Sequence, residues 1–218
     1  MAKLHLIIAN KNYSSWSLRP WLAMTMAGLE FDETMILLDT PIMKKQIAEH
    51  SRAGRLPVLR HGHVSVWESL AILEYLAETF PERNFWPKTK ATRAVARAVS
   101  NEMHAGFSGL RDTCPMNLRR PQKPIALNDA TRADIARIEE IWRDCRKLYG
   151  KGGKFLFGKF CNADAMFAPV VTRFDTYAIP VAKDTRAYMD AVLTTKAFQK
   201  WKSAALKETW ILPREEVD

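Results

Sequence analysis

The sequence predicts a small α/β domain at the start of the chain, followed by an all-α domain. Three observations predict this architecture. The first 80 residues alternate between short apolar runs and segments with apolar residues three or four apart, an order typical of βαβ units. Residues 80–89 contain two prolines and few apolar repeats, as linkers do. Beyond residue 89, almost every segment has the periodicity of a helix.

The first domain is expected to run in the order βαβαββα. Residues 3–9 and 32–39 are apolar runs that predict strands, and residues 41–50 form a short amphipathic segment that predicts a helix. Between the two strands, residues 18–31 have helical spacing and reach Gly28, a residue suited to the end of a helix. Residues 56–69 predict a hairpin around a four-residue polar link containing Gly62, and another helix starts at residue 70.

These boundaries predict two domains joined by a linker. Residues 1–80 form the first domain, 81–89 the linker and 90–218 the helical domain. Helical periodicity is present over 90–112, 129–149, 162–177 and about 184–207. A chain of 218 residues that is 47% apolar is long enough to bury cores of this size.

The charge lies unevenly along the chain. Residues 1–85 hold nine Lys and Arg and nine Asp and Glu, so residues 86–218 hold the remaining 24 and 15 and carry the whole net charge of +9. A basic domain can attract nucleic acid or acidic small molecules. The basic residues are scattered, however, with no run longer than two. We therefore expect a solvated helical surface and no nucleic-acid partner.

The amino end and the cysteines indicate a cytoplasmic protein. The apolar run before Asn10 is too short for a signal peptide or a membrane span, so no membrane partner is expected. Cys114, Cys145 and Cys161 form no CxxC pair and no even disulfide set, which fits a reducing compartment. His61 and His63 have no further Cys or His at metal-ligand spacing, so no metal is expected.

A cluster of hydroxyls precedes the first predicted helix. The stretch "NKNYSSWSLRPW", residues 10–21, contains Ser14, Ser15 and Ser17. One serine is enough to cap a helix, and no Glu or Gln follows three residues later as a capping box requires. Pro20 is best tolerated in the first turn, so the regular helix is expected to begin near Ser17.

This helix start is suited to an external anion. It has spare hydroxyls, Arg19 and no acidic residue of its own, and the helix dipole is positive there. The anion could be a phosphate or a thiolate, but the glycine-poor loop does not favour a phosphate. A serine nucleophile would need a base within reach, and no GxSxG motif or Ser/His/Asp set is visible. We therefore expect a serine hydroxyl that acts as a hydrogen-bond donor.

The motifs resemble those of the glutathione transferases. "YSSWSLRP" is similar to the serine motif of this superfamily, nearest to the zeta-like "SSC" type, and "RLPVLRHGHVSVWESLAILEYLAE" resembles its glutathione-binding hairpin and helix. "NEMHAGF" and "NADAMFAPVVTRF" resemble segments of its helical domain. The resemblance, to a bacterial serine-type, zeta-like glutathione transferase, implies a thioredoxin-like first domain and a helical domain that lines the second-substrate site.

The resemblance also implies how the site works. Ser14, with Ser15 as the alternative, would donate its hydroxyl to the sulfur of glutathione, and the thiolate would attack a small electrophile. Glutathione is then the co-substrate, and a cytoplasmic homodimer that acts in detoxification is expected. Pro57 matches the superfamily's cis-proline, Leu56 would bind the cysteinyl backbone, and Glu68 and Ser69 would bind the γ-glutamyl end. The residues implied to contact glutathione are Ser17, Arg19, Arg55, Leu56, Pro57, Glu68 and Ser69.

The second substrate is expected to meet the helical domain. Four residues at spacings of one, three and four are predicted to lie near one helix face that looks into the cleft: Met103, His104, Phe107 and Arg111. Arg173 and Tyr177, four residues apart in a later helix, are candidates of the same kind. An ordinary packed core is the alternative for such a stripe.

The sequence departs from the zeta-like pattern at one position. Trp16 stands where that pattern has Cys, which argues against maleylacetoacetate isomerisation. No Cys occurs in the first 113 residues, so mechanisms that need a cysteine in the active loop are excluded. The competing interpretation is a catalytically weak binding or scaffold protein of the same fold, whose basic helical domain serves a partner.

Overall fold

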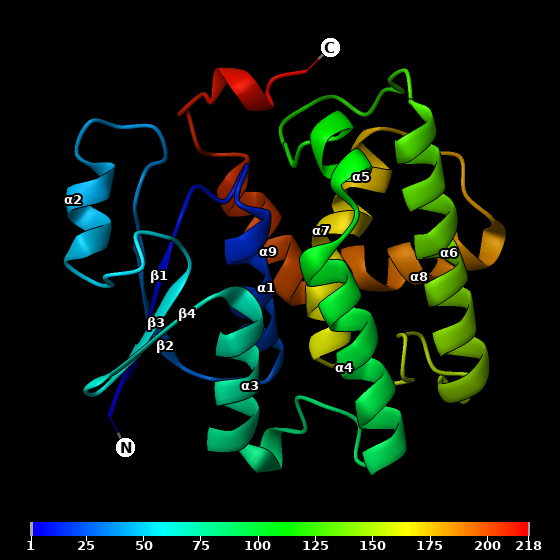
Figure 1. The fold of residues 1–218 in the computed structure, drawn as a ribbon, viewed down its shortest axis with the longest axis horizontal. Helices are drawn as coiled ribbons and strands as arrows, with labels where there is room; N and C mark the ends of the chain where they lie inside the picture. The colour runs from blue at the N-terminus through cyan, green and yellow to red at the C-terminus, as the bar shows by residue number, and fades with distance from the viewer. Residues whose placement is uncertain (1, 218) are drawn as a thin grey trace.

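The computed structural model describes residues 2–217, and its first half contains one mixed four-stranded sheet (Figure 1). The strands are β1 (Leu4–Ile8), β2 (Phe31–Met35), β3 (Val58–His61) and β4 (Val64–Trp67). Their order across the sheet is β2-β1-β3-β4. β1 pairs in parallel with β2 and antiparallel with β3, and β3 pairs antiparallel with β4. The predicted order βαβαββα is confirmed.

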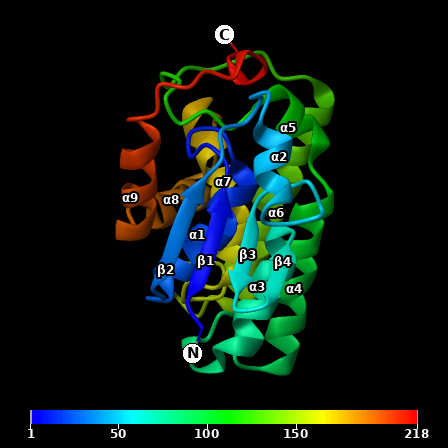
Figure 2. The same cartoon turned by 90° about the vertical axis from the view of Figure 1, so that its left-hand side faces the viewer.

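Three helices accompany the sheet: α1 (Ser15–Met26), α2 (Met43–Ala48) and α3 (Ser69–Thr79). α1 and α3 lie between the sheet and the helical half, whereas α2 lies on the outer side of the sheet (Figures 1 and 2). The end of α1 agrees with the prediction, because Gly28 follows it with a positive φ of 67°. The hairpin link is shorter than expected, since Arg60 and His61 pair within β3 and leave Gly62 and His63 as the turn.

The second half is helical after a short 3-10 turn at Pro81–Arg83. Its helices are α4 (Lys90–Ala105), α5 (Ser108–Thr113), α6 (Asp129–Tyr149), α7 (Asn162–Thr176), α8 (Lys183–Leu193) and α9 (Lys196–Ala205). A second 3-10 turn, Pro213–Glu215, lies in the C-terminal tail. None of the helices within residues 2–217 is long and apolar enough to cross a membrane.

Two predicted helices are each divided. The segment 90–112 breaks after Ala105, where Phe107 has a left-handed φ of 61°. The segment 184–207 breaks at Thr194 and Thr195, because the Thr195 hydroxyl caps α9 by accepting a hydrogen bond from the Phe198 N–H at 3.2 Å. Hydrophobic periodicity continues across both breaks, so it does not reveal them.

One large core joins the two halves. It contains Leu6 and Leu22 from the first half and Trp142, Phe167 and Trp201 from the second. The central helix α7 packs against both α1 and α4. α1 therefore has its start at the seam between the halves, which is where the candidate site lies. A smaller cluster of Ile7, Ile36, Ile47 and Val58 holds α2 on the outer side of the sheet.

Candidate functional site

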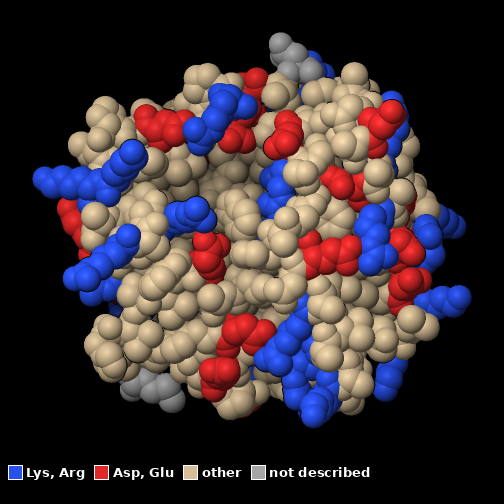
Figure 3. Space-filling view, in the orientation of Figure 1, with Lys and Arg blue, Asp and Glu red and all other residues tan. Residues whose placement is uncertain are grey.

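A cavity of about 670 Å³ opens at the seam, in the size range of small-molecule sites. Figure 3 shows the molecule hollowed on this face, with charged side chains around the opening. The hydroxyl cluster and the hairpin predicted to bind glutathione meet here with the helical half. The lining residues are Ala9, Tyr13, Ser14, Ser15, Trp16, Leu38, Met43, Ile47, Gly54, Arg55, Leu56, Glu68, His104, Arg111, Pro115, Arg173, Arg214 and Glu215.

Ser14 caps α1 and lines the cavity. Its Oγ accepts a hydrogen bond from the Ser17 N–H at 3.2 Å and lies 2.8 Å from Ser17 Oγ. Ser17 Oγ in turn accepts from the Ala9 N–H at 3.0 Å. The expected helix start near Ser17 is therefore wrong: the helix begins at Ser15, because Ser14 satisfies the free N–H of the first turn. Pro20 lies inside α1 instead of in its first turn.

Ser15 is the second hydroxyl in the cavity. It is the first residue of α1, and only 5% of it is exposed. Its Oγ has no hydrogen-bond partner within residues 2–217, so its proton is free to be donated. Ser17, by contrast, is fully buried below the cavity wall, and its hydroxyl contacts Ser14 and Ala9. Ser17 thus supports the cap and does not line the cavity.

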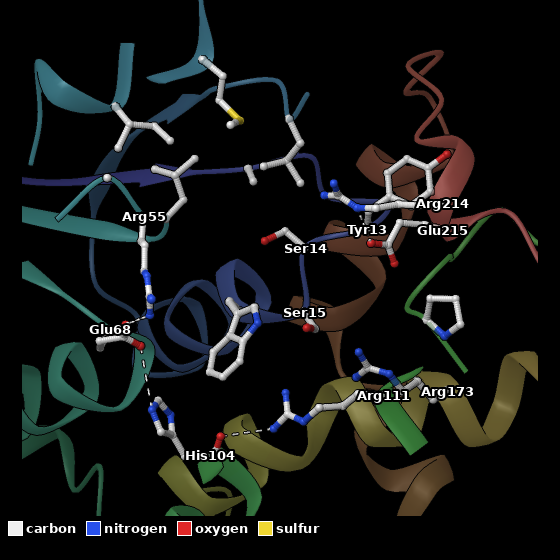
Figure 4. Close-up of a pocket in the computed structure, with 18 residues that line it drawn as sticks. Tyr13, Ser14, Ser15, Arg55, Glu68, His104, Arg111, Arg173, Arg214 and Glu215 are labelled. Atoms are coloured by element: carbon white, nitrogen blue, oxygen red, sulfur yellow. Dashed lines mark hydrogen bonds and ion pairs between the residues drawn. The ribbon is translucent and has the colours of Figure 1, made fainter. Parts of the chain in front are cut away.

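The predicted glutathione hairpin forms the opposite wall. The Leu56–Pro57 peptide bond is cis, and Leu56 lines the cavity just before β3. Glu68 lies at the start of α3 with a left-handed φ of 68°, a strained conformation for a non-glycine residue. Its carboxylate is 3.4 Å from Arg55 Nη1, and the remaining oxygen is 3.8 Å from His104 Nε2. Figure 4 shows these contacts at one end of the cavity.

Arg19 and Ser69 lie beneath the lining residues. Both are fully buried, and Arg19 Nη1 donates a long hydrogen bond of 3.4 Å to Ser69 Oγ. Arg19 Nε and Nη2 have no partner in the described part of the chain. The guanidinium lies 4.3 Å from the centre of the Trp16 ring. Burial, together with the positive charges of Arg111 and Arg173, lowers the pKa of Arg19 well below its usual value.

Trp16 lines the cavity and contacts three basic side chains. The centre of its ring lies 4.3 Å from the Arg19 guanidinium and 5.0 Å from that of Arg111, and the ring meets the His104 ring edge-on at 5.2 Å. Arg111 is thereby held against an aromatic face, a favourable arrangement for a cation. Burial and the nearby Arg19 lower the pKa of His104, which favours a neutral imidazole.

The helical half contributes only part of the predicted face. His104 and Arg111 line the cavity, but Met103 is fully buried in the core and Phe107 packs into the same core. The expectation of one helix face is wrong, because α4 ends at Ala105 and Arg111 belongs to α5. Arg173 also lines the cavity, whereas the Tyr177 hydroxyl is buried and donates to the Pro115 C=O at 2.9 Å.

The C-terminal tail closes one side of the cavity, which the sequence did not indicate. Arg214 and Glu215 line the cavity, and Arg214 Nη1 lies 2.9 Å from an oxygen of Asp39. The Trp210 Nε1–H donates to the Leu38 C=O at 3.0 Å. These contacts join residues more than 170 positions apart, so no local sequence pattern marks them.

The fold is that of the glutathione transferases. It combines a thioredoxin-like sheet with an all-helical half, and a cavity lies at their seam. Comparison with solved structures agrees. A glutathione transferase homologue from a Burkholderia strain has a TM-score of 0.71 at 21% identity, over 93% of this chain and 98% of the other. Glutathione S-transferase 1 of rice has a TM-score of 0.65 at 19% identity, over 94% and 95%.

Sequence comparison identifies the family. Residues 13–79 match the family described as "Glutathione S-transferase, N-terminal domain". A maleylacetoacetate isomerase of Dictyostelium discoideum is 30% identical over 158 residues, which cover 70% of this chain and 68% of that protein. Glutathione S-transferase 1 of Dianthus caryophyllus is 27% identical over 176 residues, 78% and 76% of the two chains. The chain belongs to the glutathione S-transferase superfamily; its place in a bacterial serine-type, zeta-like group stays a prediction.

Proposed function

We propose that this chain is a glutathione transferase that activates the glutathione thiol through a serine hydroxyl. The observation that carries the proposal is the position of Ser14, whose hydroxyl lies in the cavity at the start of α1. A hydroxyl next to the positive end of a helix stabilises an anion better than it stabilises a neutral thiol. The bound sulfur would then be a thiolate at neutral pH.

Ser17 makes Ser14 a better donor in this proposal. The Ser14 oxygen already accepts from the Ser17 N–H, and the Ser17 hydroxyl is 2.8 Å away. When glutathione binds, the two hydroxyls rotate, so that Ser17 donates to Ser14 and Ser14 donates to the sulfur. The Ala9 N–H, which donates to Ser17 Oγ, holds this chain of bonds in place. Each donor polarises the next bond, which strengthens the final bond to the thiolate. Ser15, with its free hydroxyl, is the alternative donor.

The energies are sufficient for activation. A free thiol has a pKa near 8.5, and lowering it by about two units needs about 2.7 kcal/mol. A hydrogen bond to a charged group contributes about 1.5–3 kcal/mol. The start of a helix adds about 0.3–1 kcal/mol. One hydroxyl and one helix therefore provide the required stabilisation, with no metal or cysteine.

Glutathione would lie along the wall formed by the hairpin and α3. Leu56 presents an extended backbone to the cysteinyl unit, and the γ-glutamyl end lies near the start of α3, with Glu68 facing its ammonium. Arg55 lies at the same wall, where its guanidinium would bind a carboxylate of glutathione. The Burkholderia and rice structures of the same fold were determined with glutathione, which supports this co-substrate. A homodimer and a role in detoxification are further proposals from the family.

The test is the pKa of bound glutathione, followed by the ultraviolet absorbance of its thiolate. We expect a value about two units below that of the free thiol in the wild type. Ser14→Gly removes the hydroxyl at little cost to the cap, and Ser14→Thr retains a hydroxyl. Ser14→Gly should raise the bound pKa by about one to two units, and Ser14→Thr should restore most of the depression.

Ser15→Ala serves as the matched comparison, because it removes the neighbouring hydroxyl without touching the cap. A rise in the bound pKa in Ser15→Ala alone would assign the donor role to Ser15. If wild-type protein binds glutathione without lowering its thiol pKa, the serine mechanism is wrong. Glutathione binding with no turnover of any electrophile would instead favour the scaffold interpretation.

A further inference from the structure

Two arginines in the cavity have no acidic partner. Arg111 and Arg173 both line the cavity, and neither lies within 4 Å of a carboxylate oxygen anywhere between residues 2 and 217. The cavity does contain two carboxylates, but both are paired with other arginines. Glu68 is 3.4 Å from Arg55, and Glu215 is 3.2 Å from Arg214. Within the described chain, neither arginine therefore forms a direct ion pair, and the charges of Asp134 and Asp112 offset that of Arg111 only in part.

The backbone fixes most donors of these arginines but leaves one nitrogen of each for a ligand. Arg173 Nε donates to the Cys114 C=O at 2.8 Å, and Nη1 donates to the Pro169 C=O at 3.4 Å. Arg111 Nε donates to the Gly106 C=O at 2.9 Å, and Nη2 donates to carbonyls at the end of α4. Arg173 Nη2 and Arg111 Nη1 have no partner among the described residues, and neither is sealed from the cavity as Arg19 Nη2 is.

Both guanidiniums carry a positive charge in a partly buried position, which is unfavourable in electrostatic free energy. Arg173 is 5% exposed, and its burial, together with the charge of Arg111, lowers its pKa to about 10. Burial also lowers the pKa of Arg111, although the charges of Asp134 and Asp112 act in the opposite direction. Two partly desolvated cations without a carboxylate in direct contact are unfavourable, and a bound anion would offset that cost. Guanidinium groups with free terminal N–H donors match the planar oxygens of a carboxylate.

This pair lies away from the wall proposed for glutathione. In Figure 4, Arg111 and Arg173 lie near Ser15, away from the end of the cavity that holds Arg55 and Glu68. The carboxylates of glutathione would be held at the hairpin and α3, so the arginine pair remains for the other reactant. Pro115 and Trp16 also line the cavity, with the Trp16 ring 5.0 Å from the Arg111 guanidinium, and offer apolar surface for the body of that molecule.

We propose that Arg111 and Arg173 bind a carboxylate of the second substrate, so that this enzyme acts on small electrophiles that carry a negative charge. The reaction of the second substrate rests on the proposed transferase function, whereas the binding of its carboxylate by the two arginines does not. In the reaction the glutathione sulfur attacks the electrophilic carbon and forms the C–S bond. With an aryl chloride, the C–Cl bond breaks and chloride leaves with its electron pair, while the carboxylate stays intact as the anchor.

The test uses two unreactive probes of the same shape, 3-nitrobenzoate and 3-nitrobenzamide. Their binding to the full chain is measured calorimetrically with glutathione at saturation, so that the two carboxylates of glutathione occupy their own sites. We expect the acid to bind about tenfold or more tightly than the amide, the range of one hydrogen bond to a charged group. Arg111→Gln and Arg173→Gln should each remove most of this preference and leave the affinity for the amide within about twofold.

Arg143→Gln is the matched control, because it removes one positive charge from the exposed surface of α6. It should retain the preference for the acid. Equal binding of acid and amide by the wild type would overturn the proposal, as would a preference that survives in both cavity variants. The comparison of acid and amide binding by the wild type tests the proposal even if a variant does not fold. A preference for the acid without any depression of the glutathione thiol pKa would support the anion site and reject the serine mechanism.

Discussion

Arg19 offers a sharp test of the buried electrostatics. It is fully buried, and its guanidinium makes one long hydrogen bond, 3.4 Å to Ser69 Oγ. Two of its nitrogens have no partner within the described chain, and no carboxylate oxygen between residues 2 and 217 lies within 4 Å of it. We predict that Arg19→Met stabilises the protein, because Met fills similar space with a flexible side chain and has no charge to desolvate.

The magnitude follows from these contacts. Burying an ion costs several kcal/mol after relaxation. The contact with the Trp16 ring stabilises the buried cation by about 2 kcal/mol at most, and the long hydrogen bond to Ser69 contributes about 1 kcal/mol or less. The net gain on substitution is therefore about 1–3 kcal/mol in the free energy of unfolding. For a domain of this size, each kcal/mol corresponds to about 2–4 °C in Tm.

The assay is urea unfolding at pH 7 and one fixed protein concentration, with thermal unfolding beside it. Arg97→Met is the matched control, since Arg97 forms a partly exposed pair with Glu74 at 2.7 Å and should cost about 1 kcal/mol or less. We also expect Arg19→Met to weaken glutathione binding, because Ser69 loses its donor. A destabilisation of more than about 1 kcal/mol in Arg19→Met would refute the reasoning.

Two further predictions concern titratable groups in the helical half. Burial raises the pKa of Asp164 to about 6, above its unfolded value, so this carboxyl stabilises the fold when protonated and loses that contribution as the pH rises through about 6. When the pH is lowered from 7 to 4.5, the free energy of unfolding of the wild type should rise by about 2 kcal/mol relative to that of Asp164→Asn. Denaturant titrations at both pH values measure this. If the difference between the two proteins is the same at both pH values, the prediction is wrong. Burial also raises the pKa of the Cys114 thiol to about 11 and that of Cys145 to about 12, so native protein at pH 8 should react with iodoacetamide far more slowly than unfolded protein. Mass spectrometry measures the labelling, and rapid labelling of either thiol in native protein would contradict the burial.

Local patterns in the sequence predicted most of the secondary structure and located the serine loop. The alternation of apolar runs predicted all four strands, and helical periodicity predicted residues 129–149, the same range as α6. Hydrophobic periodicity did not predict the helix breaks at Phe107 and Thr195, because the backbone turns there while the apolar pattern continues. Pro20 suggested a later start of α1, and the cap provided by Ser14 decided otherwise.

The pairing of charges around the cavity depended on the tertiary structure. Arg55 pairs with Glu68 across 13 positions, and Asp39 pairs with Arg214 across 175. Within residues 2–217, Arg111 and Arg173 are left without a carboxylate in direct contact, and the fold brings them to one cavity from α5 and α7. The sequence by itself determined which short segments bury an apolar face and where a helix begins with hydroxyls, because those properties depend on neighbours within a few residues. Only the folded chain decided which charges meet in the cavity, because an electrostatic interaction depends on distance and burial in space.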